Sequence, residues 1–157
     1  DMGTGSGVGA IAAARRGARV VAVDISPEAV RCARINVLLN RVEDSVEVRC
    51  GDLFEPVQGE RFDLVLFNPP FYAGTPRALW EHAWRSEDAL DRFARELPAV
   101  LSPSGRALLI VSSTTVGVDE ALARQHLQSQ LLWKRDMMNE RLMVLQWTPR
   151  SRSEVEA

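Results

Sequence analysis

Lysine, cysteine, histidine and long apolar runs are all scarce in this 157-residue sequence. Lys134 is the only lysine beside eighteen arginines, and 19 basic residues against 21 acidic ones give a net charge of -2. Such a balance provides no polybasic surface for a nucleic acid or an anionic membrane. The composition therefore argues against a large nucleic-acid footprint, while a small local one stays open.

The few cysteines and histidines have no metal-ligand spacing. Cys32 and Cys50 stand in a predicted helix and a predicted strand, and only His82 and His126 could assist them. We therefore expect buried, reduced thiols and no metal site. No signal peptide is seen, and no apolar run approaches the roughly 20 residues of a membrane span. We expect a soluble, cytoplasmic protein with no membrane partner.

A glycine-rich loop, Asp1-Met2-Gly3-Thr4-Gly5-Ser6-Gly7-Val8-Gly9, opens the sequence. In α/β folds such a loop follows a strand and leads into a helix whose free N-H groups bind a ligand. We therefore expect one more strand before Asp1 that the sequence does not contain. The loop also satisfies the dinucleotide pattern G-x-G-x-x-A, with Asp24 nineteen residues after Gly5, so an NAD(P)-dependent enzyme stays open.

Hydrophobic periodicity predicts alternating strands and helices after this loop. We expect a helix over 6–16, a strand over 19–25, and a helix that Ser26 caps and that ends near Asn40. Its inner face should consist of Ala29, Val30, Ala33, Val37 and Leu38. Further strands are expected over 46–50, 62–67, 106–112, 131–138 and 141–147, with a turn over 102–105. Further helices are expected over 87–101 and 118–129. Pro98 should end or bend the first of these helices early.

This order predicts an α/β fold, a Rossmann-like, doubly wound and mostly parallel sheet. The last two strands should form an antiparallel hairpin joined at Asn139-Glu140. We expect one domain over 1–147 and a polar, disordered tail over 148–157.

The tetrapeptide Asn68-Pro69-Pro70-Phe71 follows the predicted strand 62–67, at the kind of strand end where α/β sheets bind ligands. The prolines restrict the backbone, so the Asn68 side-chain oxygen and the Pro69 carbonyl would be two fixed acceptors for an NH2 group. Phe71 adds an apolar face on which a planar group could stack. In isolation the same residues could form a proline-rich turn with no function.

The order and spacing of these motifs resemble the class I S-adenosylmethionine-dependent methyltransferases. They are closest to the small-domain group with the Asn-Pro-Pro-Tyr/Phe motif, which includes release-factor glutamine N-methyltransferases and rRNA or DNA amino-methyltransferases. The resemblance runs from Asp1 to about Val111. It implies S-adenosyl-L-methionine as the cofactor, with Asp24 on the ribose and Asp52 on the adenine. The cofactor-binding residues that it implies are Asp1, Gly3, Thr4, Gly5, Ser6, Gly7, Asp24, Ile25, Asp52, Leu53 and Asn68.

Methyl transfer to an amide or exocyclic amino nitrogen is the activity that the resemblance implies, with Asn68, Pro69, Pro70 and Phe71 as catalytic residues. The acceptor would be a protein glutamine, in a release factor or ribosomal protein, or an RNA base. Phe71 stands where the release-factor type usually has tyrosine, and 77–84 replaces its acidic glycine-rich loop, so glutamine, adenine and guanine all stay open. An NAD(P)-dependent oxidoreductase and a non-catalytic binding module that kept the fold are the alternatives.

Overall fold

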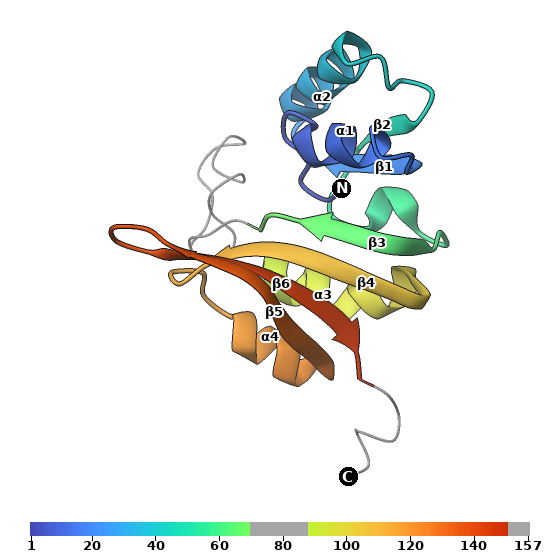
Figure 1. The fold of residues 1–157 in the computed structure, drawn as a ribbon. Coiled ribbons are helices and arrows are strands. Elements are labelled where there is room, and N and C mark those ends of the chain that lie inside the picture. The colour runs from blue at the N-terminus through green and yellow to red at the C-terminus, as the bar shows by residue number, and fades with distance from the viewer. Residues whose placement is uncertain (70–87, 151–157) are drawn as a thin grey trace. The chain divides into compact units, whose positions relative to one another are not determined.

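The computed structural model describes residues 1–69 and 88–150 of the chain (Figure 1). The chain divides into two compact units, Asp1–Gln58 and Gly59–Ala157. The single domain expected over 1–147 stays a prediction. In the described residues, no helix combines the length and the apolar character needed to cross a bilayer.

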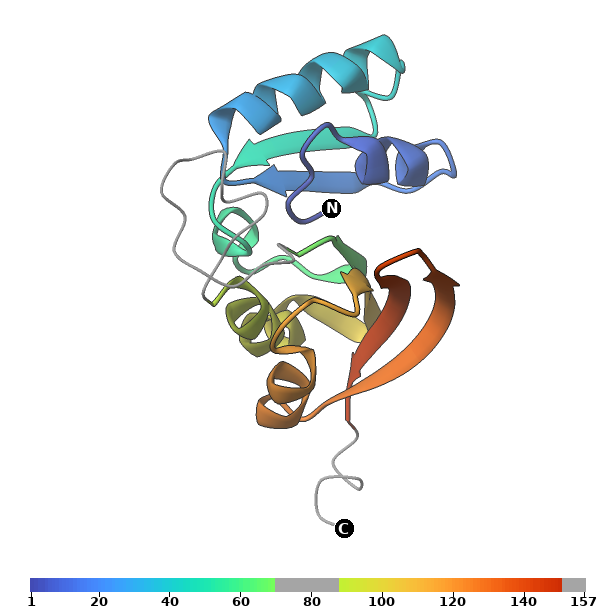
Figure 2. The same ribbon diagram turned by 90° about the vertical axis from the view of Figure 1, so that its left-hand side faces the viewer.

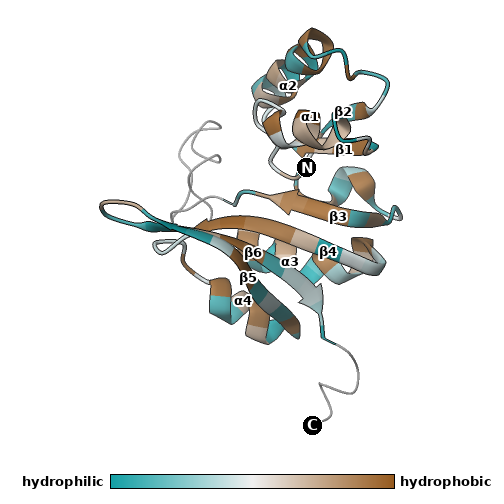
Figure 3. Cartoon of the chain, in the orientation of Figure 1, coloured by the Kyte–Doolittle hydropathy of each residue, from teal (hydrophilic) through white to brown (hydrophobic). Residues whose placement is uncertain are grey.

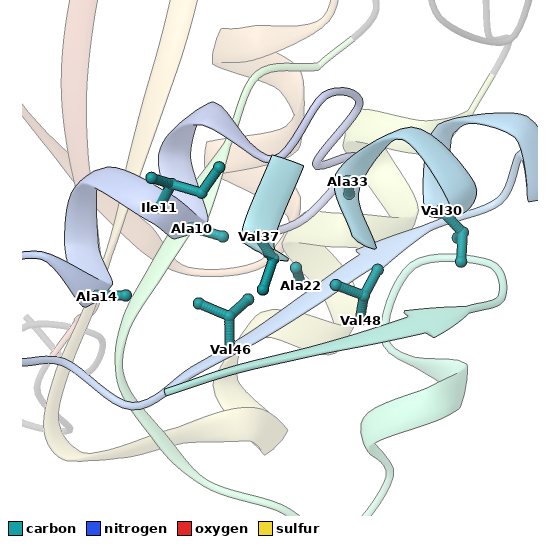
Figure 4. Close-up of a cluster of buried hydrophobic side chains, with 9 residues drawn as sticks. All are labelled: Ala10, Ile11, Ala14, Ala22, Val30, Ala33, Val37, Val46 and Val48. Atoms are coloured by element: carbon teal, nitrogen blue, oxygen red, sulfur yellow. The ribbon is translucent and has the colours of Figure 1, made fainter. Parts of the chain in front are cut away.

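The first unit is a parallel two-stranded sheet with helices packed on it. Its strands pair in register from Val20 with Val46 to Asp24 with Cys50. Small and β-branched side chains from both helices and both strands form its core, as Figure 4 shows. The core residues in that view are Ala10, Ile11, Ala14, Ala22, Val30, Ala33, Val37, Val46 and Val48. The elements are α1 (Val8–Ala14), β1 (Val20–Asp24), α2 (Pro27–Leu39), β2 (Val46–Cys50) and the 3₁₀-helix η1 (Glu55–Val57).

Helix α2 begins as the sequence predicts. Pro27 is its first residue, and the Ser26 hydroxyl accepts a hydrogen bond from the Ala29 N-H at 3.2 Å. The predicted inner face is confirmed at Val30, Ala33 and Val37, which are buried, while Ala29 is half-buried. The prediction is wrong at Leu38, which is 60% exposed. Residues next to each other in a helix point about 100° apart, so a leucine adjacent to buried Val37 turns toward solvent.

The two cysteines also differ from the prediction, because Cys32 and Cys50 are both exposed thiols. Cys32 lies on the outer side of α2, while Cys50 is the last residue of β2. Apolar burial of cysteine is a tendency of the residue type. The position of each residue on its own helix or strand overrides that tendency here.

Replacing Ser26 by alanine should lower the free energy of unfolding by about 1 kcal/mol, because an N-cap hydroxyl that accepts a first-turn N-H contributes that much. The same hydroxyl donates to the Glu28 carboxylate at 2.8 Å, so the substitution removes both contacts. Urea denaturation measures the change. Ser129→Ala, at an exposed strand position, is the control and should change the free energy by less than half as much. Equal effects of the two substitutions would contradict the capping role.

The second unit is a four-stranded mixed sheet in the order β3-β4-β6-β5. Strands β3 and β4 are parallel, and β6 runs antiparallel to both β4 and β5. Figure 2 shows α3 and α4 on the same face of this sheet. The elements are β3 (Phe62–Phe67), α3 (Ala89–Val100), β4 (Leu101–Ser112), α4 (Val118–Arg124), β5 (Leu127–Asp136) and β6 (Arg141–Pro149).

Aromatic packing holds α3 on the sheet. Phe93 of α3 is fully buried and stacks on Phe67 of β3, with ring centroids 4.4 Å apart. Trp147 of β6, also fully buried, lies 6.4 Å from the Phe93 ring at a tilted angle. Figure 3 shows β3 and much of β4 in the hydrophobic colour. Contacts of this kind fix the end of β3, the strand that Asn68 follows.

Four predicted elements of this unit have different bounds in the structure, including the strand expected over 131–138, which is β5 (Leu127–Asp136). The helix expected over 118–129 ends at Arg124, because His126 takes a left-handed backbone (φ 50°) and the chain then enters β5 at Leu127. Strand β4 already begins at Leu101, so it includes the residues 102–105 that were predicted as a turn. Its pairing with β3 shifts register between Phe62 and Leu64. Strand β6 extends to Pro149, so two residues of the predicted tail pair with β5.

Strand β3 and helix α3 also differ in detail from the prediction. The continuous apolar run over 62–67 predicts a buried strand of a parallel sheet. In β3, however, only Val65 and Phe67 are buried and Leu64 is 39% exposed. Helix α3 continues through Pro98 to Val100. The Arg61 guanidinium donates to the carbonyls of Pro98 and Leu101, at 3.4 and 2.9 Å, which satisfies acceptors at this helix end.

Candidate functional site

The Asp1 carboxylate holds the glycine-rich loop closed. Its Oδ2 accepts a hydrogen bond from the Thr4 hydroxyl at 2.6 Å and another from the Ala10 N-H at 2.9 Å. The carboxylate lies so close to Gly9 that a Cβ there would stand 2.8 Å from Oδ1, closer than real contacts permit. Glycine at position 9 is therefore required by this packing, and Asp1 fixes both ends of the turn that leads into α1.

The Asp24 carboxylate contacts the same loop from the end of β1. Its Oδ2 accepts from the Gly5 N-H at 2.8 Å, and its Oδ1 accepts from the Ser26 N-H at 3.0 Å. A carboxylate oxygen can accept two hydrogen bonds, so each oxygen keeps capacity for a ligand donor. Gly5 has a left-handed backbone (φ 56°) with no atom within 4 Å of its would-be Cβ. A ligand could therefore approach the backbone here.

Asp52 lies at the same end of the first unit as Asp24. The two strands end side by side, since Asp24 pairs with Cys50 and the Gly51 N-H donates to the Asp24 carbonyl at 3.0 Å. Leu53 then takes a left-handed backbone (φ 44°), which is costly for a residue with a side chain. The structure thus brings the predicted ribose and adenine acids to one edge of the sheet.

The remaining predicted cofactor residues belong to the same edge of this unit. Gly3 and Gly7 have left-handed backbones, with φ of 62° and 85°. Ser6 is exposed in the loop, and Ile25, 38% exposed, directly follows Asp24. All these residues are continuous with Asp1 or Asp24, so the first unit holds every predicted cofactor residue except Asn68.

Asn68 belongs to the second unit, where it directly follows β3. Its side chain is exposed, whereas both neighbours are anchored, since Phe67 packs on Phe93 and Pro69 is fully buried. An exposed amide between two buried residues needs little further ordering when a ligand binds it. Pro70 and Phe71, the other two residues of the predicted motif, lie outside the described residues.

Two contributors to the site were not predicted from the sequence. Ser26 donates its N-H to Asp24, a contact for which the Asp-x-Ser spacing of an Asx turn is a signal. Asn36 of α2 donates its side-chain N-H to the Ser6 carbonyl at 2.8 Å. Thirty positions separate Asn36 from Ser6, and no sequence pattern connects them. The glycine loop is therefore held from α2 as well as from Asp1 and Asp24.

The arrangement favours binding of a polar organic ligand. Carboxylates at the ends of β1 and β2, beside open loop backbone, can accept hydrogen bonds from ribose hydroxyls and an exocyclic amine. Across residues 1–69 and 88–150, no group of three or more His, Cys, Asp or Glu side chains could hold a metal ion.

The chain is similar in sequence to known methyltransferases. Residues 1–138 match the family model described as methyltransferase small domain. The chain is 39% identical over 128 residues to the release factor glutamine methyltransferase of Cereibacter sphaeroides, an overlap of 72% of this chain and 46% of that protein. It is 32% identical over 126 residues to a tRNA (adenine-N6)-methyltransferase of Porphyromonas gingivalis, with coverage of 70% and 48%.

A 16S rRNA methyltransferase of T. thermophilus, solved in complex with AdoMet and guanosine, has a similar structure. The TM-score is 0.74 at 24% identity, and the alignment covers 96% of this chain and 36% of that one. At this identity the likeness shows the fold, a Rossmann-like α/β domain. The chain spans about half the length of the two curated relatives. The match therefore does not show that this chain has the activity of either whole relative.

Proposed function

Because the chain belongs to the methyltransferase small domain family, we propose that it transfers a methyl group from S-adenosylmethionine to an NH2 nitrogen. The acceptor nitrogen is a protein amide or an exocyclic amine of RNA. The observation that carries this proposal is the exposed Asn68 at the end of β3, between buried Phe67 and Pro69. The attachment of the glycine loop to Asp1 and Asp24 supports it. We also propose that it acts in the cytoplasm, where release factors and ribosomes are found.

The residues of the first unit fit the cofactor. Asp24 has acceptor capacity left on both oxygens for two ribose hydroxyls, and Asp52 suits the adenine amine. Gly3, Gly5 and Gly7 would let the methionine part lie against the loop backbone. When bound, the cofactor supplies a methyl carbon activated by its sulfonium.

Asn68 and Pro69 would orient the acceptor. Amide and aromatic amine nitrogens are poor nucleophiles, because their lone pair is delocalised. Hydrogen bonds from the NH2 group to the Asn68 side-chain oxygen and to the Pro69 carbonyl would favour a more tetrahedral nitrogen and aim its lone pair. Orientation of this kind can lower the activation barrier for methyl transfer by several kcal/mol without a strong base. The anchoring of Asn68 between buried Phe67 and Pro69 supports this role.

Calorimetric titration separates this proposal from the oxidoreductase alternative. S-adenosylhomocysteine should bind saturably to the intact protein, and NAD should give no heat of binding under the same conditions. An NAD(P)-dependent oxidoreductase would also use Asp24 and the glycine loop, but it would have no role for Asn68. Tight binding of NAD alone would contradict the proposal. Transfer of label from tritiated S-adenosylmethionine to an acceptor distinguishes an enzyme from a non-catalytic binding module.

A further inference from the structure

The turn between β5 and β6 lies at the same edge of the second unit's sheet as Asn68. Strand β5 runs parallel to β3, because β4 is parallel to β3 and β6 is antiparallel to both β4 and β5. The carboxyl ends of β3, β4 and β5 therefore share one edge. Figure 1 shows the β5–β6 turn at the end of the sheet toward which β3 points.

This hairpin extends beyond the last paired residue of β4 and is held rigidly. Ser112 ends β4 opposite Leu142, and the hairpin continues past that pair. The Ser113 N-H donates to the Arg141 carbonyl at 2.8 Å, while the Arg141 N-H donates to the Ser113 hydroxyl at 3.0 Å. The Met137 N-H donates to the Glu140 carbonyl at 2.7 Å. The turn is thus attached to the end of β4 and needs little ordering on binding.

Apolar side chains are exposed at this turn. Met138 is fully exposed and Met137 is 47% exposed, and Val116, in the loop that follows β4, is 67% exposed. The residue preferences of hairpin turns do not explain the two methionines, because tight hairpin turns favour Asn, Asp and Gly. Exposed methionines adapt to varied apolar surfaces and are used in protein recognition. The two methionines, Met137 and Met138, are called the hairpin tip below.

The charges around the hairpin tip favour a polypeptide over a nucleic acid. Arg141 donates to the Asp136 carboxylate at 2.6 Å, and this hydrogen bond lowers the pKa of Asp136, so the pair stays ionised and mutually neutralised. The other charged residues of the hairpin end are Lys134 and Arg135 of β5 and Glu140 of the turn. Binding to nucleic acid is driven by neutralising several phosphates, whereas an apolar tip gains from burial.

We propose that the hairpin tip is the docking surface for a polypeptide acceptor that presents an apolar patch beside its target amide. The inference rests on the proposed function and narrows its substrate class. Contact at the tip would position the acceptor chain at the edge where Asn68 lies exposed. Docking energy from the tip would then hold the target amide near the Asn68 oxygen.

The test uses the double variant M137S/M138S of the intact protein and tritiated S-adenosylmethionine. The acceptors are a fraction of ribosomal proteins and release factors and, separately, deproteinised total RNA. The matched control is I35S/L39S, which removes two exposed apolar side chains from α2 in the other unit. Protease and ribonuclease digestion identify the labelled polymer.

Label should enter the protein fraction, and M137S/M138S should raise KM for that fraction about tenfold with kcat unchanged. Binding of S-adenosylhomocysteine should stay the same, and I35S/L39S should behave as wild type. An unchanged KM, or label found only in RNA with both double variants equal, would overturn the inference while the proposed function stands. Absence of transfer to any fraction by the wild type contradicts the proposed function, and the docking inference falls with it.

Discussion

Replacing Asn68 by alanine should lower kcat for methyl transfer by about 10²- to 10³-fold, the effect of removing one group that orients or stabilises a reacting centre. The side-chain oxygen is one of the two acceptors proposed for the target NH2, and alanine has none. Binding of S-adenosylhomocysteine should change little, since the predicted cofactor residues other than Asn68 lie in the first unit. Single-turnover kinetics with tritiated S-adenosylmethionine measure the chemical step directly.

Folding should not confound this experiment, because Asn68 is exposed and its anchors Phe67 and Pro69 are unchanged. Asn68→Gln is a second variant, which keeps the amide but displaces it by one methylene. This variant should also lose most of its turnover if catalysis requires the amide oxygen at the position it has in Asn68, and not only a polar side chain. An alanine variant with wild-type kcat would remove Asn68 from the mechanism.

The strands and caps that depend on local patterns were predicted well. Both 46–50 and 62–67 have the predicted bounds, because each is a short run of β-forming residues between turn signals. The start of α2 at Pro27 follows from the Ser-Pro-Glu sequence. The hairpin at the end of the chain was predicted too, although β5 begins at Leu127, inside the expected helix. The chain changes from helix to strand at His126, which has a left-handed backbone. Local propensity does not predict that backbone conformation.

The residues of the candidate site stay a prediction, and the structure adds contacts among them that the sequence did not predict. The resemblance implied that Asp1 and Asp24 serve the cofactor, which stays a prediction. The structure shows that both hold the glycine loop through backbone N-H groups. Those contacts depend on the path of the chain between distant positions, which periodicity cannot specify. The exposure of Met138 is another case, since an apolar residue in a turn is indistinguishable in sequence from a strand end. Only the paired geometry of β5 and β6 places it at a tip.

Replacing Asp24 by alanine should weaken binding of S-adenosylhomocysteine by about 100-fold or more. Hydrogen bonds to a charged group contribute about 1.5–3 kcal/mol each, and two lost ribose contacts correspond to at least that factor in affinity. The substitution also leaves the N-H groups of Gly5 and Ser26 without their acceptor. The loop would therefore be less ordered before the ligand arrives, which adds to the loss. Isothermal titration calorimetry measures the affinity.

Asp24→Asn separates the two roles of this carboxylate. The asparagine side chain has one carbonyl oxygen, so its NH2 must face either the Gly5 or the Ser26 N-H, donor against donor. Affinity should fall, with a loss smaller than that of alanine. Asp44→Ala, an exposed acid after α2 in the same unit, is the control and should bind as wild type. If Asp24→Ala binds normally while urea denaturation shows a less stable protein, the carboxylate serves only to hold the loop, and another residue must bind the ribose.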